Sequence, residues 1–576
     1  MDKRMEIGIS RVANNGKGVG TAPDGKTVFV TGAVPGDRLL VDVTAERSRL
    51  YEARINSVLS PSPDRIEPDC PELDRCGGCC FRQMTYAAEL KAKTGFVRDA
   101  FRRIGGFDIE LEPIIPSPLT EAYRNKVEFA VGTDSEGKLF PGFYSEKTHQ
   151  AVPVENCRLI SEEFLKIAKR FFNIINIKDN IKEYISSKSF KDNRKNTENI
   201  ENLKVIKKNK LLLSVENKAD NSGIFRQLIL RKSGLTGEIL LCVVTAEHIE
   251  KSLSDAAEQI RSAFPSVNSV CMVVNRSSGA VELGEAPRFL SGSRFIRDQI
   301  CGVPVEIGPL SFFQVNTPAA EALYRTAAEF ADIRQDDVML DLYCGMGSIG
   351  LSMAAGCRQL IGGEIVPEAV ESAKRNAAVM GLTNTRFFCG DAGEIAQTLI
   401  REHIHPSLII LDPPRRGCSP ETLQTVLTLD PARIVMVSCD PATAARDCRT
   451  LCDAGFTLTR LRPADLFPRT KHVETVCLLS KGDVKSKKIR VEFSLEDMDT
   501  DGFKKGATYN AIRDWIKEKY GYRVTNLNIA QVKQKHGIIE RENYNKPKSP
   551  DSKQPRCPEE KVKAIEDAMR HFQMIE

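Results

Sequence analysis

Two stretches in the last third of the chain carry side chains suited to covalent chemistry. Asp412 follows the apolar run Leu408–Leu411, and Cys439 follows the run Val435–Ser438; prolines come soon after each. Each run predicts a buried strand that ends in a turn. In a parallel α/β sheet, side chains just past the carboxyl ends of strands face the ligand crevice. We therefore expect Asp412 and Cys439 to share a pocket in which the thiol acts as a nucleophile rather than as a core residue.

Composition limits the classes of protein to consider. A chain of 576 residues is too long for one core and predicts three to five domains of roughly 150 residues each. The formal net charge is only +5, so a surface for nucleic acid must be a local patch. The first residues lack the apolar core of an export signal, and no apolar run is long enough to span a membrane. The 17 cysteines then indicate thiols or metal ligands in a reducing compartment, and we expect a cytoplasmic protein without membrane contact.

A glycine-rich loop between two predicted strands is typical of a cofactor site. The first strand covers residues 337–342, and the loop at 345–350 reads Gly-Met-Gly-Ser-Ile-Gly. The second strand ends at Glu364, about 20 residues further on, where a carboxylate can accept hydrogen bonds from ribose hydroxyls. The loop alone fits a nicotinamide dinucleotide and S-adenosylmethionine equally. Asp-Pro-Pro at 412–414 and the thiol after the next strand favour S-adenosylmethionine, because a dehydrogenase has no use for them.

Three closely spaced cysteines and a remote one indicate an inorganic centre. They are Cys70, Cys76, Cys79 and Cys157. Two glycines between Cys76 and Cys79 let the backbone fold around a small group. Zinc sites more usually have two Cys-x-x-Cys pairs, and only one is present, whereas an iron–sulfur cluster tolerates a remote fourth thiolate. The spacing favours an iron–sulfur cluster over zinc and over incidental thiols.

The remaining patterns predict a multidomain α/β protein. Residues 1–60 alternate short strands with glycine-rich turns, as in an OB-like barrel, a fold often used on single-stranded nucleic acid. Residues 61–320 combine the cysteines with a central α+β domain, an antiparallel sheet with helices on one face, interrupted by a polar insertion at about 173–222. Residues 321–482 carry the pattern of a Rossmann-like domain. Residues 483–576 form a basic, mainly helical extension. Its sequence fits a nucleic-acid-binding surface and a merely solvated one equally well.

Five motifs together resemble those of a known family. They are Phe-Phe-Gln-Val-Asn at 312–316, Asp-Leu-Tyr-Cys-Gly-Met-Gly at 341–347, Asp-Pro-Pro-Arg-Arg-Gly at 412–417, Ser-Cys-Asp-Pro at 438–441 and His-Val-Glu-Thr-Val at 472–476. With them, residues 1 to about 482 resemble the class I, S-adenosylmethionine-dependent RNA uracil-C5 methyltransferases. Within that family the chain is most similar to the 23S rRNA enzymes that carry a TRAM domain and a 4Fe-4S cluster. Residues 1–60 resemble the TRAM domain, which implies RNA binding.

The resemblance implies roles for residues at the motif positions. It implies that the methyl donor is bound by Gln314, Tyr343, Glu364, Asp391 and Asp412. Cys439 matches the nucleophile and Glu474 the base, with His472 as second choice for the base. The ligands of the 4Fe-4S cluster would be Cys70, Cys76, Cys79 and Cys157. Ser348 departs from the pattern, because related enzymes often have Asn there, and no donor contact is assigned to it.

Covalent catalysis explains why these residue types are needed. C5 of uracil is too weak a nucleophile to take a methyl group from a sulfonium, and addition of a thiolate at C6 gives C5 carbanion character. The thiol must then be partly ionised, and Arg415 and Arg416 are candidates for the basic surroundings that favour the thiolate. The target base must leave its stack to expose C6, so we expect an RNA loop as the substrate.

RNA is thus the expected partner, 23S rRNA by the resemblance, and we expect a monomer. A tRNA uracil methylase would use the same motifs, although bacterial tRNA enzymes of this family generally lack the TRAM domain and the cluster. A radical S-adenosylmethionine enzyme would show Cys-x3-Cys-x2-Cys, whereas here five residues separate the first two cysteines. An RNA-binding or assembly protein with a vestigial site is disfavoured, because the nucleophile, base and donor motifs are all intact.

Overall fold

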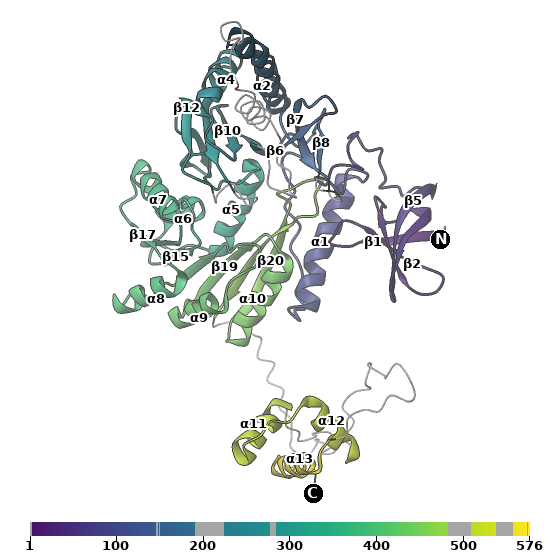
Figure 1. Cartoon of the computed structure of the whole chain (residues 1–576). Helices are drawn as coiled ribbons and strands as arrows, with labels where there is room; N and C mark the ends of the chain where they lie inside the picture. The colour runs from purple at the N-terminus through teal and green to yellow at the C-terminus, as the bar shows by residue number, and fades with distance from the viewer. Residues whose placement is uncertain are drawn as a thin grey trace, which may run out of the picture. The chain divides into compact units, whose positions relative to one another are not determined.

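The computed structural model describes residues 3–145, 148, 150–189, 224–276, 284–481, 509–536, 557–572 and 574–575. The chain divides into two compact units, residues 1–482 and 483–576. The first unit contains a closed β-barrel, two seven-stranded sheets and a β-hairpin (Figure 1). None of the helices in the described ranges combines the length and the apolar character that crossing a bilayer requires.

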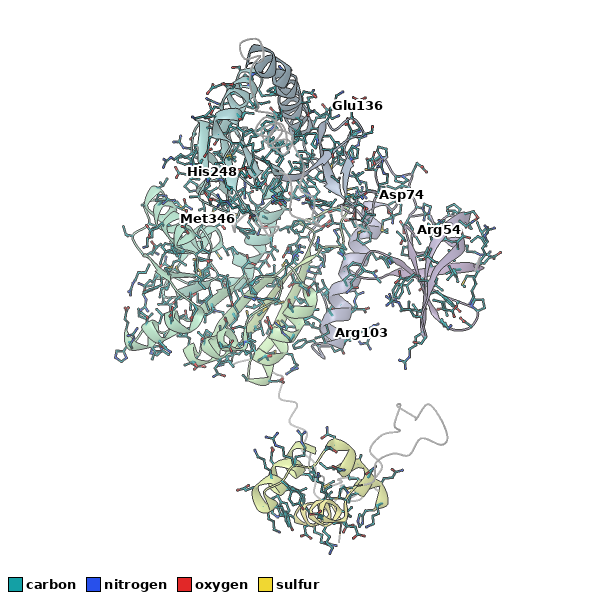
Figure 2. All side chains as sticks on the ribbon, viewed as in Figure 1. Arg54, Asp74, Arg103, Glu136, His248 and Met346 are labelled. Atoms are coloured by element: carbon teal, nitrogen blue, oxygen red, sulfur yellow. The ribbon has the colours of Figure 1, made fainter. Side chains whose placement is uncertain are left out.

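The N-terminal barrel closes around the inward-facing side chains of five short strands. In spatial order they are β1 (Arg4–Val12), β2 (Gly18–Thr21), β3 (Thr27–Thr31), β5 (Leu50–Ser60) and β4 (Arg38–Glu46). Alternate residues such as Val28 and Val30 are buried in one cluster, while Arg54 on β5 lies on the outer surface (Figure 2). This alternation confirms the predicted N-terminal barrel.

The central sheet has the strand order β12-β11-β10-β9-β6-β7-β8. Its strands are β6 (Lys126–Thr133), β7 (Leu139–Tyr144), β8 (Ala151–Pro153), β9 (Phe225–Lys232), β10 (Ile239–Thr245), β11 (Val267–Val274) and β12 (Arg288–Gly292). Helices α2 (Glu162–Ser189) and α4 (Glu250–Ala263) share a core with one face. The hairpin of β13 (Ile296–Ile300) and β14 (Val303–Ile307) shares a core with the other face.

Two expectations for this region need correction or completion. The sheet is not wholly antiparallel, because β10 and β11 run parallel, and α4 connects them as the crossover that a parallel pair requires. The helices also do not form its only cover, since the β13–β14 hairpin lies against the second face. The predicted insertion at 173–222 begins within α2, and its residues 190–222 lie outside the described part of the chain.

The third sheet has the order β17-β16-β15-β18-β19-β21-β20. Its strands are β15 (Val338–Leu342), β16 (Gln359–Glu364), β17 (Thr385–Cys389), β18 (Leu408–Leu411), β19 (Arg433–Ser438), β20 (Thr457–Ala464) and β21 (Glu474–Ser480). In β18, Leu408 and Ile410 enter one core while Ile409 and Leu411 enter the other. Burial on both faces is why these strands appear in the sequence as continuous apolar runs. The predicted Rossmann-like domain is confirmed.

Helices cover both faces of this third sheet. One core includes α5 (Thr317–Ala331), α6 (Ser348–Met353) and α7 (Pro367–Val379), and a short 3-10 helix η2 (Ala354–Gly356) follows α6. The other includes α1 (Tyr86–Arg103), α8 (Ala392–Arg401), α9 (Pro420–Leu429) and α10 (Pro441–Asp453). Figure 1 shows α1 beside α10, although α1 precedes the central sheet in sequence. Val97 and Phe101 of α1 are buried in this core, and Arg103 in its last turn lies on the surface (Figure 2).

The second unit is built on helices α11 (Tyr509–Tyr520), α12 (Asn526–Lys535) and α13 (Glu559–His571). Its core includes Ile516, Ile529 and Ile565. Trp515 and His571 stack with ring centroids 5.0 Å apart. Residues 483–508, 537–556, 573 and 576 of the extension predicted at 483–576 lie outside the described ranges.

Candidate active site and cysteine cavity

The carboxyl ends of three parallel strands bring predicted site residues to one edge of the third sheet. β15 pairs with β18 and β18 with β19, all in parallel. Tyr343, Asp412 and Cys439 are the residues that follow these strands. Tyr343 has φ of 65°, a left-handed conformation that is uncommon outside glycine and turns the chain sharply into the loop. The strand ends therefore form the edge at which a pocket was expected.

Glu474 reaches the same edge from the opposite chain direction. It begins β21, which pairs antiparallel with β19 so that Thr475 is opposite Ser438. On the other side of β21, Glu474 is opposite Ala464 of β20. Glu474 is only 6% exposed. A carboxyl group is thus held in the protein interior at the level of the Cys439 thiol.

The surroundings of Cys439 oppose the ionisation of its thiol. Burial, together with the nearby Glu474 and Asp412, raises the pKa of the Cys439 thiol to about 12, and Arg415 acts in the opposite direction. These surroundings act against the partly ionised thiol that the sequence led us to expect. The reason is that two acidic groups and desolvation outweigh one guanidinium.

Three carboxyl groups near this edge have raised pKa values. Burial raises the pKa of Asp412 to about 7 and that of Asp341 to about 8. Burial, followed by the charge of Asp412, raises the pKa of Glu474 to about 8. Asp341 Oδ2 accepts a hydrogen bond from Gly350 N at 2.9 Å, while Oδ1 has no partner among the described residues. Such a group of carboxyls favours a cationic ligand, because a nearby positive charge lets them ionise.

Hydrogen bonds fix the loops that carry the other candidate donor ligands. Glu364 ends β16, and its two carboxylate oxygens accept from Gly345 N at 3.0 Å and Val366 N at 2.9 Å. The Tyr343 hydroxyl lies 3.0 Å from Thr422 Oγ1. The main-chain oxygen of Gln314 accepts from Asn125 Nδ2 at 2.9 Å. The glycine loop is thereby held against the ends of β15 and β16.

Two further candidates are engaged in local contacts. Asp391 is exposed and caps α8, because its Oδ1 accepts from Glu394 N at 2.9 Å. His472 packs edge-on against the ring of Phe467. Burial, followed by the positive charges of Arg415 and Lys471, lowers the pKa of His472 to about 4. Among the predicted site residues, Asp412, Cys439 and Glu474 share the strand-end edge, and the charges of Asp412 and Glu474 act on the Cys439 thiol.

Residues 190–482 match the protein family described as tRNA (Uracil-5-)-methyltransferase. An RNA methyltransferase of Halalkalibacterium halodurans, named as uncharacterized, is 32% identical over 476 residues, which cover 82% of this chain and 96% of that protein. The chain belongs to the tRNA (uracil-5-)-methyltransferase family. An uncharacterized RNA methyltransferase of Clostridium tetani is likewise 32% identical over 472 residues, with 82% of this chain and 95% of the relative covered.

A solved structure agrees with this assignment. The tRNA (uracil-54, C5)-methyltransferase of Pyrococcus abyssi, in complex with S-adenosyl-L-homocysteine, aligns with a TM-score of 0.60 and 25% identity. The alignment covers 82% of this chain and 100% of that one. The protein is thus an S-adenosylmethionine-dependent RNA uracil-5 methyltransferase. The expected activity, methyl donor and RNA substrate are confirmed at this level.

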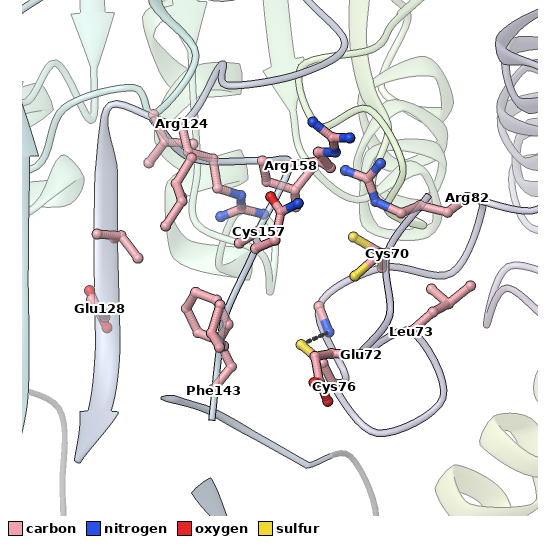
Figure 3. A pocket seen from close by; sticks show the side chains of 18 of the residues that line it. Cys70, Glu72, Leu73, Cys76, Arg82, Arg124, Glu128, Phe143, Cys157 and Arg158 are labelled. Atoms are coloured by element: carbon pink, nitrogen blue, oxygen red, sulfur yellow. Dashed lines mark hydrogen bonds between the residues drawn. The ribbon is translucent and has the colours of Figure 1, made fainter. Parts of the chain in front are cut away.

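The methyltransferase also has a cavity of about 410 Å³ lined by the four cysteines predicted as cluster ligands (Figure 3). Cys70, Cys76 and Cys79 lie between β5 and α1, and Cys157 follows β8. Gly78 N donates to Cys76 Sγ at 3.4 Å, the dashed bond in Figure 3. Burial raises the pKa of the Cys76 and Cys157 thiols, and that of Cys79 to about 11.

The donor set of this cavity suits an anionic, sulfur-bound centre. Arg82 lines it and is 3% exposed. Its Nη1 donates to Asp69 Oδ1 at 2.7 Å, while Nη2 has no partner among the described residues. The guanidinium also opposes the rise in the pKa of Cys79. Among the described residues, no group of three or more side chains could hold a single metal ion. A 4Fe-4S cluster does not require such a group, because each of its four thiolates binds a different iron.

Sequence reasoning gave no role to Phe312 or Tyr324. Phe312 is 75% exposed, although the next residue, Phe313, is buried. An exposed ring beside Gln314 is available to stack on an unpaired base. Tyr324 is 2% exposed, and its hydroxyl lies 3.4 Å from Ser348 Oγ. The pair Phe312-Phe313 in the sequence could have drawn attention to Phe312. Tyr324, in contrast, looks like any other residue on the apolar face of α5.

Proposed function

We propose that this methyltransferase acts as a monomer on C5 of a uridine in 23S rRNA, with Cys439 as the nucleophile and Glu474 as the base. The observation that carries the proposal is that Cys439, Glu474 and Asp412 lie at one strand-end edge, where burial and then the two carboxyls raise the pKa of the thiol. A thiol and a buried carboxyl at the same edge can act in succession on the adjacent carbons C6 and C5.

The reaction needs both groups in a fixed order. The ionised Cys439 sulfur bonds to C6, and the electron pair of the C5=C6 bond moves to the C4 carbonyl oxygen as an enolate. C5 then bonds to the methyl carbon of the sulfonium, whose carbon–sulfur bond breaks to leave S-adenosylhomocysteine. Glu474 removes the proton from C5, the C5=C6 bond forms again, and the bond between C6 and Cys439 breaks.

The charges at the site support Glu474 over His472 as the base. A base is most effective when its pKa lies near the working pH. The pKa of Glu474 is raised to about 8, whereas that of His472 is lowered to about 4. A sulfonium bound beside Asp412 would favour the ionised forms of both Glu474 and Cys439. Donor binding would thus activate the base and the nucleophile together.

For the donor we propose the set named by the resemblance. Its members are Gln314, Tyr343, Glu364, Asp391 and Asp412. Glu364, at the end of β16, is placed to accept hydrogen bonds from the ribose. Asp412 and the unpartnered Oδ1 of Asp341 are acceptors for the cationic part of the donor.

We further propose that Cys70, Cys76, Cys79 and Cys157 hold a 4Fe-4S cluster. The shared cavity and the buried, half-satisfied Arg82 beside it support this assignment. When bound, the cluster would join the segment before α1 to the end of β8 and place a redox-active group there. The role of Arg82 is to offset the negative charge of the thiolates.

Two features support a single-stranded RNA loop as the substrate, and the choice of 23S rRNA rests on the resemblance of the motifs. A five-stranded barrel of this kind is much used on single-stranded nucleic acid, and the exposed Phe312 offers a stacking surface beside the donor site. The alternative is tRNA, because the Pyrococcus abyssi protein is named for uracil 54 of tRNA. The deciding experiment maps 5-methyluridine in rRNA and tRNA from a strain that lacks this protein. Loss from 23S rRNA alone supports the proposal, and loss from tRNA alone would assign the alternative.

A further inference from the structure

Glu474 is preceded by a loop, residues 465–473, whose backbone is held from outside the sheet. The loop connects β20 to β21. Arg469 within it has φ of 69°, a left-handed conformation that is strained in a residue other than glycine. Its carbonyl oxygen accepts a hydrogen bond from Cys80 N at 2.9 Å. A strained shape of this kind persists only when its surroundings impose it.

Helix α1 supplies a fully buried lysine to the start of this loop. Lys93 Nζ donates to Asp465 Oδ1 at 2.7 Å and to the main-chain oxygen of Phe467 at 3.1 Å. It also lies 2.8 Å from Glu89 Oε1 on the previous turn of α1. Three acceptors satisfy all three donors of an ammonium group. The lysine therefore ties the first residues of the loop to the helix.

Two more side chains of α1 complete the contact. Glu89 Oε1 accepts from Arg469 N at 2.7 Å, at the strained residue itself. Tyr86 Oη donates to Asp465 Oδ2 at 2.9 Å and accepts from Ser117 N at 2.8 Å. The loop is thus held at both Asp465 and Arg469 by charged or hydroxyl groups of a single helix.

Stability alone does not account for this arrangement. Val97 and Phe101 already anchor α1 in an apolar core, and buried ion pairs are often no more stabilising than apolar residues of the same volume. Directional hydrogen bonds, unlike apolar contacts, select one loop conformation. We propose that Lys93, Glu89 and Tyr86 are positioning residues that hold the 465–473 loop so that the Glu474 carboxylate faces C5 of the bound uracil. This inference rests on the role of Glu474 proposed above.

A misplaced base has a kinetic signature of its own. The base acts after the sulfur has bonded to C6 and after the methyl group has reached C5. If Glu474 is displaced, both earlier steps still occur, but the proton stays on C5 and the bond between C6 and Cys439 cannot break. Methylated RNA then accumulates on the protein. A variant that is merely less stable loses adduct and turnover together.

The test compares four variants on RNA with ordinary uridine and S-adenosylmethionine. Lys93→Met and Tyr86→Phe remove contacts to the loop, and Glu474→Gln is the reference for loss of the base. Arg433→Met is the matched control: Arg433 pairs with the buried Asp337 at 2.6 Å, at the amino end of β19 and away from the loop. Denaturing gels measure the RNA–protein adduct, and mass spectrometry of the adduct shows whether the uracil carries the methyl group.

We expect Lys93→Met to accumulate methylated adduct at about 10 to 100 times the wild-type level, since small misplacements of a catalytic group cost up to this factor in rate. Tyr86→Phe should show the same signature more weakly, and Arg433→Met should show none. If Lys93→Met does not fold, Tyr86→Phe, which removes one hydroxyl, decides. The inference is overturned if Glu474→Gln accumulates adduct while the foldable α1 variants behave like Arg433→Met. If Glu474→Gln itself accumulates no methylated adduct, Glu474 is not the base, and the proposed positioning role is then wrong as well.

Discussion

Ser438 and Thr475 are opposite each other where β19 and β21 run antiparallel. Cys439 follows the first of these residues, and Glu474 precedes the second. The strand pairing therefore sets the thiol and the carboxyl at the same edge of the sheet. The two groups proposed to act in succession on C6 and C5 are thus held by paired strands, and only the approach to Glu474 depends on a loop.

Replacing Cys439 with Ala should lower methylation by more than about 10³-fold, as removal of a covalent nucleophile does in other enzymes. Donor binding should stay near normal, because Glu364 and Asp412 are unchanged. Cys301→Ala, at a half-buried thiol outside the cysteine cavity and the strand-end edge, is the control and should keep full activity. Full turnover by the Cys439 variant would remove the mechanism.

The same mechanism can be trapped in the wild-type protein. RNA that contains 5-fluorouridine should form a stable adduct, because Glu474 cannot remove fluorine from C5 as it removes a proton. Mass spectrometry should find the nucleotide on the Cys439 peptide. An unmodified Cys439 peptide after that reaction would contradict the covalent step.

Much of the site could be predicted from the sequence, because the end of a buried strand can be recognised from the residues around it. The apolar runs before Asp412 and Cys439 are followed by proline turns, and the parallel sheet does place both residues at one edge. The raised pKa of the thiol was not accessible, since it depends on burial and on Glu474 from a distant strand. The contact of Lys93 with Asp465 joins residues 372 positions apart, and nothing near either residue marks it.

Donor binding should release protons that S-adenosylhomocysteine does not. At pH 7, Glu474 with a pKa of about 8 is mostly protonated, and Asp412 with a pKa of about 7 is half protonated. The sulfonium charge favours the ionised carboxylates and lowers both pKa values, whereas S-adenosylhomocysteine lacks this charge. We expect about one additional proton released with the donor, measured by calorimetry in buffers of different ionisation enthalpy. Equal release with both ligands would mean that the sulfonium binds elsewhere; Asp412→Asn should reduce the difference.

Phe312→Ala should weaken RNA binding without affecting the donor. Phe312 is 75% exposed, and stacking of a base on an aromatic side chain contributes about 1–3 kcal/mol. The KM for RNA should therefore rise by about 5- to 150-fold. Phe312→Tyr keeps a planar ring and should remain active, whereas Phe312→Leu keeps only apolar volume and should resemble the Ala variant. An unchanged KM in the Ala and Leu variants would show that the ring does not contact RNA.

The cysteine cavity should contain iron. Protein purified without oxygen should be brown and carry about four irons per chain. Cys157→Ser removes the remote thiol and should lower both the iron content and the thermal stability. Cys389→Ser is the control, because Cys389 is exposed and does not line the cavity. One zinc per chain in place of iron would contradict the cluster.

Asp391 has two possible roles, and one substitution separates them. Its carboxylate caps α8 by accepting from Glu394 N at 2.9 Å, and the resemblance implies a contact with the donor. Asparagine caps helices as well as aspartate does, whereas alanine costs about 1 kcal/mol. Asp391→Asn should therefore unfold at the wild-type temperature, and Asp391→Ala at a lower one.

If Asp391 also binds the donor, both variants should bind it at least about tenfold more weakly, because a hydrogen bond to a charged group contributes about 1.5–3 kcal/mol. Wild-type donor affinity in Asp391→Asn would show that Asp391 only caps α8 and does not bind the donor.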